Sequence, residues 1–162
     1  SVTFEPGETT TSQQHNWILF RYAEILLNYA EAMVNAYGDP DYTGSYSLSA
    51  RDAVNQVRNR GDVKMPAYPT DMKKDAFLKR LRNERRVEFA FEGQRFWDLR
   101  RWKELDNMQN IYKVKVVKQT DGTIQYTKVL HATYNIQDKM YFYPISNTEL
   151  FKNHKLVQNT GW

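Results

Sequence analysis

The chain has 162 residues, of which 41% are hydrophobic and 14% aromatic, so it is long and apolar enough to form a folded domain and is not a disordered segment. It contains no cysteine, which excludes a disulfide framework, a thiolate metal site and a cysteine nucleophile. The net charge of +4 does not indicate nucleic-acid binding, because the basic residues at 79–86 are interleaved with glutamates, whereas a phosphate-binding surface needs an unopposed basic face.

The first fifteen residues are polar, rich in threonine and glutamine, and carry the turn signal Pro6-Gly7. We expect residues 1–15 to be an irregular lead-in to a domain at 16–162. This stretch has neither the basic region nor the apolar region of a signal peptide. No run of about 18 apolar residues occurs in the sequence, so no membrane-spanning helix is expected.

Two helices are predicted next. Residues 17–37 have apolar side chains at intervals of three and four, Asn16 can cap their start, and Gly38 ends them. The second helix begins at Ser49, a candidate N-cap, and ends at Gly61. Such a helical hairpin resembles a tetratricopeptide-type unit, with tyrosines at 22 and 29 filling the gaps between helices. Small residues are expected where the two helices touch: Ala23, Ala30, Ala32 and Ala53.

Charged and aromatic residues are densest between Leu81 and Trp102. After a loop at 62–70, we expect two helices that meet at Gly93, the first capped by Thr70 or Asp71. Apolar residues lie on several faces of these helices, which predicts that they are mostly buried. One face combines Phe77, Leu81, Arg85, Glu88 and Phe91.

Buried charges in these helices require partners, because an unpaired one costs several kcal/mol. The spacing of three residues predicts that Arg85 pairs with Glu88 and that Glu92 pairs with Arg95. We therefore expect a polar network inside an aromatic core that includes Trp97 and Trp102.

The pattern changes to strands after Trp102. Residues 112–120 and 123–130 alternate around Asp121-Gly122, which is a strong signal for a two-residue hairpin turn. Val116-Val117 interrupts the alternation and predicts a bulge or a strand covered on both faces. A short aromatic run at 140–145 is strand-like. The predicted class is mainly α: a tetratricopeptide-like helical hairpin plus long buried helices, with a small β-hairpin insertion and an irregular C-terminal tail.

No catalytic arrangement is found. Glu84 and Glu88 lie one helical turn apart, but glycosidase carboxylates flank a cleft from different elements, and two on one helix beside arginines are more often ion-paired. No nucleophile, P-loop or dinucleotide motif occurs. We therefore expect no enzyme, metal site or cofactor. The three histidines lie far apart with no partner at ligand spacing: His15, His131 and His154.

Four segments resemble the SusD/RagB family of nutrient-binding outer-membrane lipoproteins. The run ERRVEFAFEGQRFWDLRRW at 84–102 is similar to the family hallmark, RYAEILLNYAEA at 21–32 to its RYAE helix, and VRNRG at 57–61 to a helix end. The C-terminal tail resembles the family's ending at Glu149-Leu150, Asn153, Leu156, Gln158-Asn159 and Gly161-Trp162. Ser146 and Thr160 stand where that ending often has prolines, which is expected to loosen two turns. The motif residues are interpreted as structural: Arg21, Glu24, Glu84, Arg85, Glu88, Glu92, Gly93, Arg95, Trp97, Asp98, Arg101 and Trp102.

The resemblance implies that residues 16–162 are the C-terminal domain of a larger binding protein at the cell surface of a Bacteroidetes-type outer membrane. It implies an oligosaccharide or other nutrient as ligand, a SusC-like TonB-dependent transporter as partner, and a role in polysaccharide uptake. Membrane anchoring is implied only through an N-terminal lipid whose cysteine this chain lacks. No ligand-binding residue carries over from the family.

Physical chemistry supplies candidate ligand residues. Sugar rings stack on aromatic side chains, and their hydroxyls bond to amides, carboxylates and guanidinium groups. The alternative hypothesis is a helical scaffold that binds a protein or peptide and has no sugar site. A cluster of loop tyrosines beside amides favours the sugar, and a broad apolar patch favours the protein. The candidates, each individually more often a packing residue, are Tyr42, Tyr46, Tyr68, Tyr126 and Tyr134.

Overall fold

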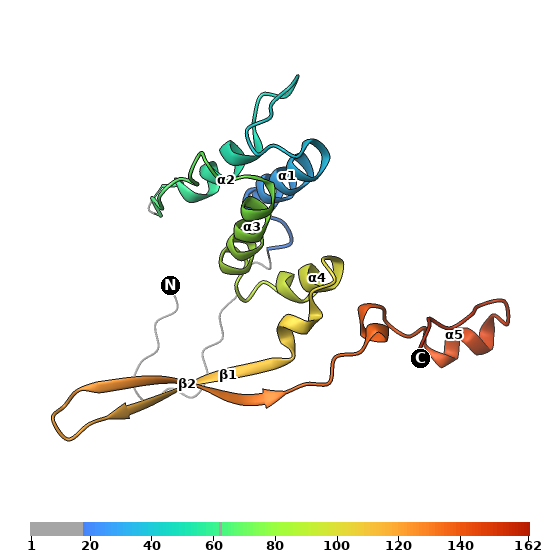
Figure 1. Ribbon diagram of the computed structural model, residues 1–162. Coiled ribbons are helices and arrows are strands. Elements are labelled where there is room, and N and C mark those ends of the chain that lie inside the picture. The colour runs from blue at the N-terminus through green and yellow to red at the C-terminus, as the bar shows by residue number, and fades with distance from the viewer. Residues whose placement is uncertain (1–17, 62) are drawn as a thin grey trace. The chain divides into compact units, whose positions relative to one another are not determined.

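The computed structural model describes residues 18–61 and 63–162, and the chain divides into two compact units, Ser1–Arg85 and Arg86–Trp162. Most of the regular elements are helices, and the strands form one two-stranded sheet, which confirms the predicted mainly α class (Figure 1). The elements are α1 (Tyr22–Tyr37), α2 (Ala50–Arg58), α3 (Lys74–Glu88), α4 (Gln94–Arg101), β1 (Asn110–Lys118), β2 (Ile124–Thr133) and α5 (Asn147–Lys152), with 3-10 turns at Leu105–Met108 and Asp138–Tyr141.

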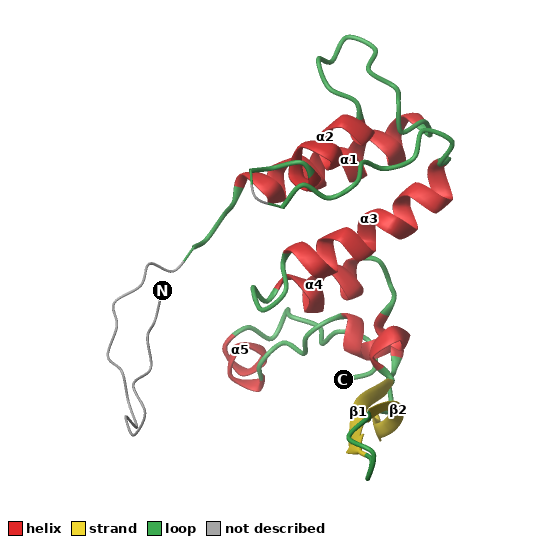
Figure 2. Ribbon diagram, turned by 90° about the vertical axis from the view of Figure 1, so that its left-hand side faces the viewer, coloured by secondary structure: helices red, strands yellow, loops and turns green. Residues whose placement is uncertain are grey.

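The predicted helical hairpin is formed by α1 and α2, which lie side by side in both views (Figures 1 and 2). Ser49 is the N-cap of α2, as predicted from the sequence, and it makes a reciprocal capping box with Asp52. Gly38 ends α1, and its backbone N–H donates to Val34 O. The contact buries Leu26, Leu27, Ala30, Met33 and Val34 of α1 and Ala50, Ala53, Val54 and Val57 of α2.

The boundaries of these helices differ from the prediction. Residues 18–20 are not helical and are exposed, so α1 begins only at Tyr22, and the proposed cap Asn16 lies outside the described residues. An apolar repeat alone does not hold a helix, because most helical stability in proteins comes from tertiary packing. The second helix ends at Arg58, three residues before Gly61. Ala32 was also misplaced, since it lies on the exposed side of α1.

A buried ion pair joins α2 to α3. The guanidinium of Arg58 bonds to the carboxylate of Glu84, and their side chains are only 7% and 15% exposed. Tyr68, from the intervening loop, donates its hydroxyl to the same carboxylate at 3.2 Å. Arg58 Nε also donates to Pro66 O at 2.7 Å. Polar contacts therefore hold the loop against both helices.

Helix α3 is buried along one stripe and not all round. Phe77, Leu81 and Arg85 are buried at intervals of four, and Arg85 donates to Asn28 Oδ1 of α1 at 2.6 Å. The opposite face is solvated, so the prediction of a mostly buried helix was too strong. The helix begins at Lys74, which places neither Thr70 nor Asp71 at its N-cap. Phe91 was expected on the buried stripe, but it lies beyond the end of the helix and is fully exposed.

The predicted break between the two helices occurs at Gly93, whose φ of 77° lies in the left-handed region that favours glycine. Because the chain turns here, the helical spacing from Glu92 to Arg95 is lost. Arg95 makes no ion pair within the described part of the chain, and burial, followed by the like charge of Arg86, lowers its pKa. Asp98 is buried and accepts a bond from Arg101 Nε at 2.9 Å.

The β1–β2 hairpin turns through three residues instead of the predicted two. Gln119 N–H donates to Thr123 O at 2.8 Å, and Gly122 N–H donates to Gln119 O at 3.0 Å. Gly122 has a φ of 87°, which is the left-handed position that such a three-residue loop requires.

The bulge lies at the other end of the hairpin from the one predicted. Ile111 pairs with Ala132 and Tyr112 with Leu130, so His131 is the extra residue. Val116-Val117 pairs in regular register, and both faces of the sheet are largely exposed, so neither sequence interpretation of this dipeptide was right.

The run at 140–145 is not a strand, because no other strand lies beside it in the described residues. The tail's side chains hold it instead: Gln158 exchanges two hydrogen bonds with the backbone of Ile145, at 2.8 and 2.9 Å. Ser146 caps α5 by accepting from Glu149 N–H at 3.4 Å, so it starts a helix and does not loosen a turn.

Replacing Glu84 with glutamine removes the negative charge from a buried pair and leaves the Arg58 guanidinium uncompensated. We expect the free energy of unfolding of the N-terminal unit to fall by about 3–5 kcal/mol. Urea denaturation followed by circular dichroism measures it. The matched control is Lys152→Ala, which breaks an exposed pair with Glu149 and should cost less than about 1 kcal/mol. Equal losses for the two variants would contradict the structural role of the buried pair.

Candidate binding sites

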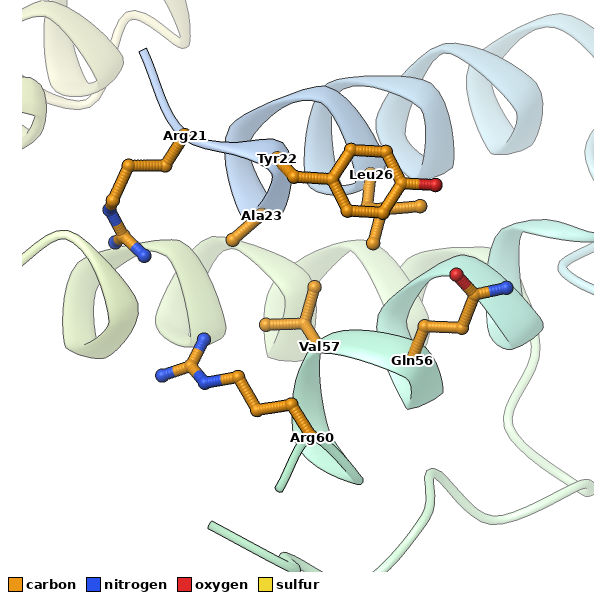
Figure 3. A pocket seen from close by; sticks show the side chains of 7 residues that line it. All are labelled: Arg21, Tyr22, Ala23, Leu26, Gln56, Val57 and Arg60. Atoms are coloured by element: carbon orange, nitrogen blue, oxygen red, sulfur yellow. The ribbon is translucent and has the colours of Figure 1, made fainter. Parts of the chain in front are cut away.

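A pocket of 450 Å³ lies between the start of α1 and the end of α2 (Figure 3). Leu26 and Val57 are buried and form its apolar part, and Ala23 lies beside them. The ring of Tyr22 and the amide of Gln56 lie at one end of the pocket. Its volume and mixed lining are typical of small-molecule sites in proteins.

Two arginines stand at the other end of this pocket. Arg21 occupies the N-cap position of α1 with extended backbone, and Arg60 follows the last turn of α2. Figure 3 shows both guanidinium groups on the same side of the pocket, away from Tyr22 and Gln56. The pocket therefore combines an exposed aromatic ring, an amide and guanidinium donors around an apolar surface. This is the set of groups that a sugar ring and its hydroxyls require.

The sequence interpretation missed this pocket. It placed Tyr22 between the packed helices, but this residue is 70% exposed. It also took Arg21 as a structural motif residue only. The signal that was available is that Gln56 lies on a polar position of α2 and that Arg60 lies just beyond its end. Both line the pocket together with the first turn of α1.

The loop from α1 to α2 carries a second aromatic group. It extends away from both helices (Figures 1 and 2). Tyr42 stacks on Tyr37 with ring centroids 4.2 Å apart, and the hydroxyls of Tyr37 and Tyr46 lie 3.2 Å apart. That hydrogen bond raises the pKa of Tyr37. Gly44 is required beneath this cluster, since a Cβ there would lie 2.5 Å from Tyr42 Oη.

The tyrosine cluster, which consists of Tyr37, Tyr42 and Tyr46, is held in place by a buried arginine. Arg51 bonds to both carboxylate oxygens of Asp41 and to the backbone oxygens of Pro69, Thr70 and Met72. Asp41, the ion-pair partner of Arg51, lies directly before Tyr42 in the sequence. Bonding to Arg51 lowers the pKa of Asp41 and raises the pKa of the guanidinium.

The structure brings together only part of the predicted tyrosine set. Tyr42 and Tyr46 are exposed and close to each other, but Tyr68 is only 2% exposed and is not available to a surface ligand. It lies in the core because its hydroxyl bonds to Glu84 and its ring packs on Phe77; burial, followed by the charge of Glu84, raises its pKa. Tyr126 and Tyr134 are exposed and belong to the C-terminal unit.

Two kinds of feature are absent from residues 18–61 and 63–162. No group of three histidine, aspartate or glutamate side chains in these ranges is placed to hold a metal ion. No helix in them is long and apolar enough to cross a membrane.

Comparison with known proteins points to a single family. The SusD family model matches residues 3–162. SusD-like protein P38 of Formosa agariphila is 37% identical over 90 residues, which are 52% of this chain and 16% of that protein. SusD-like protein P2 of the same organism is 31% identical over 102 residues, which are 60% of this chain and 19% of that protein. This chain thus spans less than a fifth of either relative.

A solved structure agrees with this result. The crystal structure of a SusD-like protein from Bacteroides fragilis superimposes with a TM-score of 0.77 at 32% sequence identity. The match covers 98% of this chain and 28% of that one. The described fold is therefore shared with that SusD-like protein.

The Asp41–Arg51 ion pair predicts that the stability of the folded chain depends on pH. Since the folded-state pKa of Asp41 is lowered from 3.8, its contribution to stability is complete above that value and is lost as the pH falls through the lower folded-state pKa. We expect Asp41→Asn to destabilise the chain at pH 7, and the difference from the natural chain to shrink as the pH falls towards 2. Urea denaturation at several pH values measures it. If the stability difference between the two chains were as large at the lowest pH as at pH 7, it would not arise from the charge of Asp41.

Proposed function

Because the chain belongs to the SusD family, we propose that it is part of a cell-surface protein that binds oligosaccharides. In this proposal the protein is lipid-anchored in the outer membrane and passes its ligand to a SusC-like TonB-dependent transporter. It binds the sugar without chemically changing it. Residues 16–162 form the C-terminal domain of that protein, and the N-terminal lipid anchor belongs to a part outside this chain.

The observation that carries the proposal is the pocket between α1 and α2. It presents a Tyr22 ring for stacking and a Gln56 amide for hydroxyl groups around the apolar Leu26 and Val57. Stacking on an aromatic face combined with a few convergent polar groups is how proteins hold sugars. The tyrosine cluster at the loop offers a second stacking surface among polar residues, with the hydroxyls of Thr43 and Ser45 beside it in the sequence.

A second candidate function is a protein contact through the hairpin. One face of the β1–β2 sheet carries six exposed apolar side chains, and an exposed apolar patch is typical of an interaction surface. A two-stranded sheet is only marginally stable in water by itself, which also favours a partner. Lys118 and Lys128 lie on the same face. Its apolar residues are Tyr112, Val114, Val116, Ile124, Tyr126 and Leu130.

Substitution in the pocket tests the first candidate. A panel of neutral oligosaccharides is titrated into the full chain by isothermal calorimetry. For each sugar that binds, we expect Tyr22→Ala to weaken binding roughly tenfold, because a stacking ring and its buried area are lost. Gln56→Ala should weaken it as well. The matched control is Tyr126→Ala, an equally exposed tyrosine in the other unit, which should leave sugar affinity unchanged.

Sugar binding that depends on Tyr22 supports the oligosaccharide proposal. Loss of sugar binding through Tyr126→Ala alone would place the sugar on the hairpin, which contradicts both the pocket as the sugar site and a protein partner for the hairpin. If no neutral sugar binds, or if both pocket variants bind as the natural chain does, the pocket is not the site. Mass spectrometry of the sugar after incubation checks the chemistry, and a hydrolysed product would contradict a binding-only role.

A further inference from the structure

A second cavity, of 530 Å³, lies within the C-terminal unit between α4 and the segment 141–143. Its aromatic lining includes Trp97, Phe142 and Tyr143, which are 56%, 65% and 56% exposed. Trp97 was expected in the core. It lies instead on an outer face of α4, because this eight-residue helix buries only Asp98 and Leu99. We call this cavity the α4 groove.

The wall of the α4 groove formed by residues 141–143 is held by specific hydrogen bonds. Tyr141 Oη accepts from Leu105 N–H at 3.2 Å. Asn159 Nδ2 donates to Tyr143 O at 2.6 Å, and Trp162 Nε1 donates to Phe142 O at 3.1 Å. The aromatic rings are therefore presented by a backbone that the C-terminal tail keeps in place.

Arg100 of α4 lies among these rings. Its guanidinium carbon is 4.5 Å from the ring centroid of Tyr143, 5.1 Å from that of Phe96 and 6.0 Å from that of Trp97. Aromatic faces attract a guanidinium group, but they offer no hydrogen-bond acceptors to its N–H groups. In the described part of the chain no carboxylate pairs with Arg100, whereas the neighbouring Arg101 pairs with Asp98.

Two further cations and the absence of acids complete the charge of the α4 groove. Arg101, which pairs with Asp98, lines it, and so does Lys103, which follows the end of α4 and has a φ of 55°. No aspartate or glutamate is among the lining residues. The groove thus joins an apolar aromatic surface to a planar guanidinium, and that group binds a carboxylate through two parallel hydrogen bonds.

We propose that the α4 groove binds a saccharide residue that carries a carboxylate, with the sugar ring against Trp97 and Tyr143 and the carboxylate on Arg100. The ring stacking explains the exposed aromatics, and the carboxylate supplies the partner that Arg100 lacks. A neutral sugar would leave the charge of the guanidinium group without a counter-charge, and an acidic peptide without rings would leave the aromatic faces without a stacking partner. The proposal rests on the proposed function in that the ligand is a saccharide, but it concerns a different site from the pocket between α1 and α2.

The probe is trigalacturonate, and its fully methyl-esterified form is the matched neutral ligand with the same rings. Calorimetric titration of the full chain should show the acid binding at least about tenfold more tightly than the ester, since charge-assisted hydrogen bonds are lost with the charge. Added salt should weaken binding of the acid and leave the ester unaffected.

Variants assign the binding to the groove. Arg100→Gln should abolish the preference for the acid, and Arg100→Lys should restore part of it, because a lysine keeps the charge but not the two-pronged geometry. Trp97→Ala should weaken binding of the acid and of the ester by the same factor. The control is Lys115→Gln, which removes one exposed cation from the hairpin and should change neither affinity. Circular dichroism establishes that each variant is folded.

Three results would overturn the inference: no binding of trigalacturonate, equal binding of the acid and the ester, or unchanged acid preference in Arg100→Gln. Equal affinity for a triglutamate peptide would also overturn it, because the ring would then contribute nothing. Failure of the proposed function gives a different result. In that case the affinity for neutral sugars does not depend on Tyr22, while binding of the acid still depends on Arg100.

Discussion

The ion pair between Arg58 and Glu84 is the interaction on which the N-terminal unit depends. It is buried, and it joins α2 to α3 while Tyr68 from the loop shares its carboxylate. Taking both charges out of water is unfavourable, and further hydrogen bonds, from Tyr68 to Glu84 and from Arg58 to Pro66 O, compensate for it. Gln56 and Val57 directly precede Arg58 in α2 and line the pocket beside the first turn of α1.

Arginines serve three different purposes in this chain. Arg58 and Arg85 are buried and bonded to side chains of neighbouring helices. Arg51 donates hydrogen bonds to backbone oxygens and thereby positions the loop that carries the tyrosine cluster. Arg100 lies on aromatic rings at the surface. The guanidinium group suits all three because it is always charged, is planar and offers five donors.

Sequence patterns predicted the helical hairpin, the N-cap at Ser49, the Gly93 break and the existence of the β-hairpin, because each depends on local chemistry within a few residues. They did not predict where α1 begins, which residue forms the bulge, or which tyrosines are exposed. Arg95 shows the reason. Its spacing from Glu92 suits an ion pair only if the helix continues, and the turn at Gly93 removes that geometry.

The sequence by itself determined the helical hairpin, the break at Gly93 and the β-hairpin, and its motifs identified the family that the comparisons then showed. The tertiary structure alone decided which aromatic side chains face solvent. Tyr68 was a candidate for a surface ligand and Trp97 was expected in the core, yet the tyrosine is buried beside Glu84 and the tryptophan lines an open groove. Exposure depends on what packs against a residue from distant segments, and helical or strand periodicity carries no information about those neighbours.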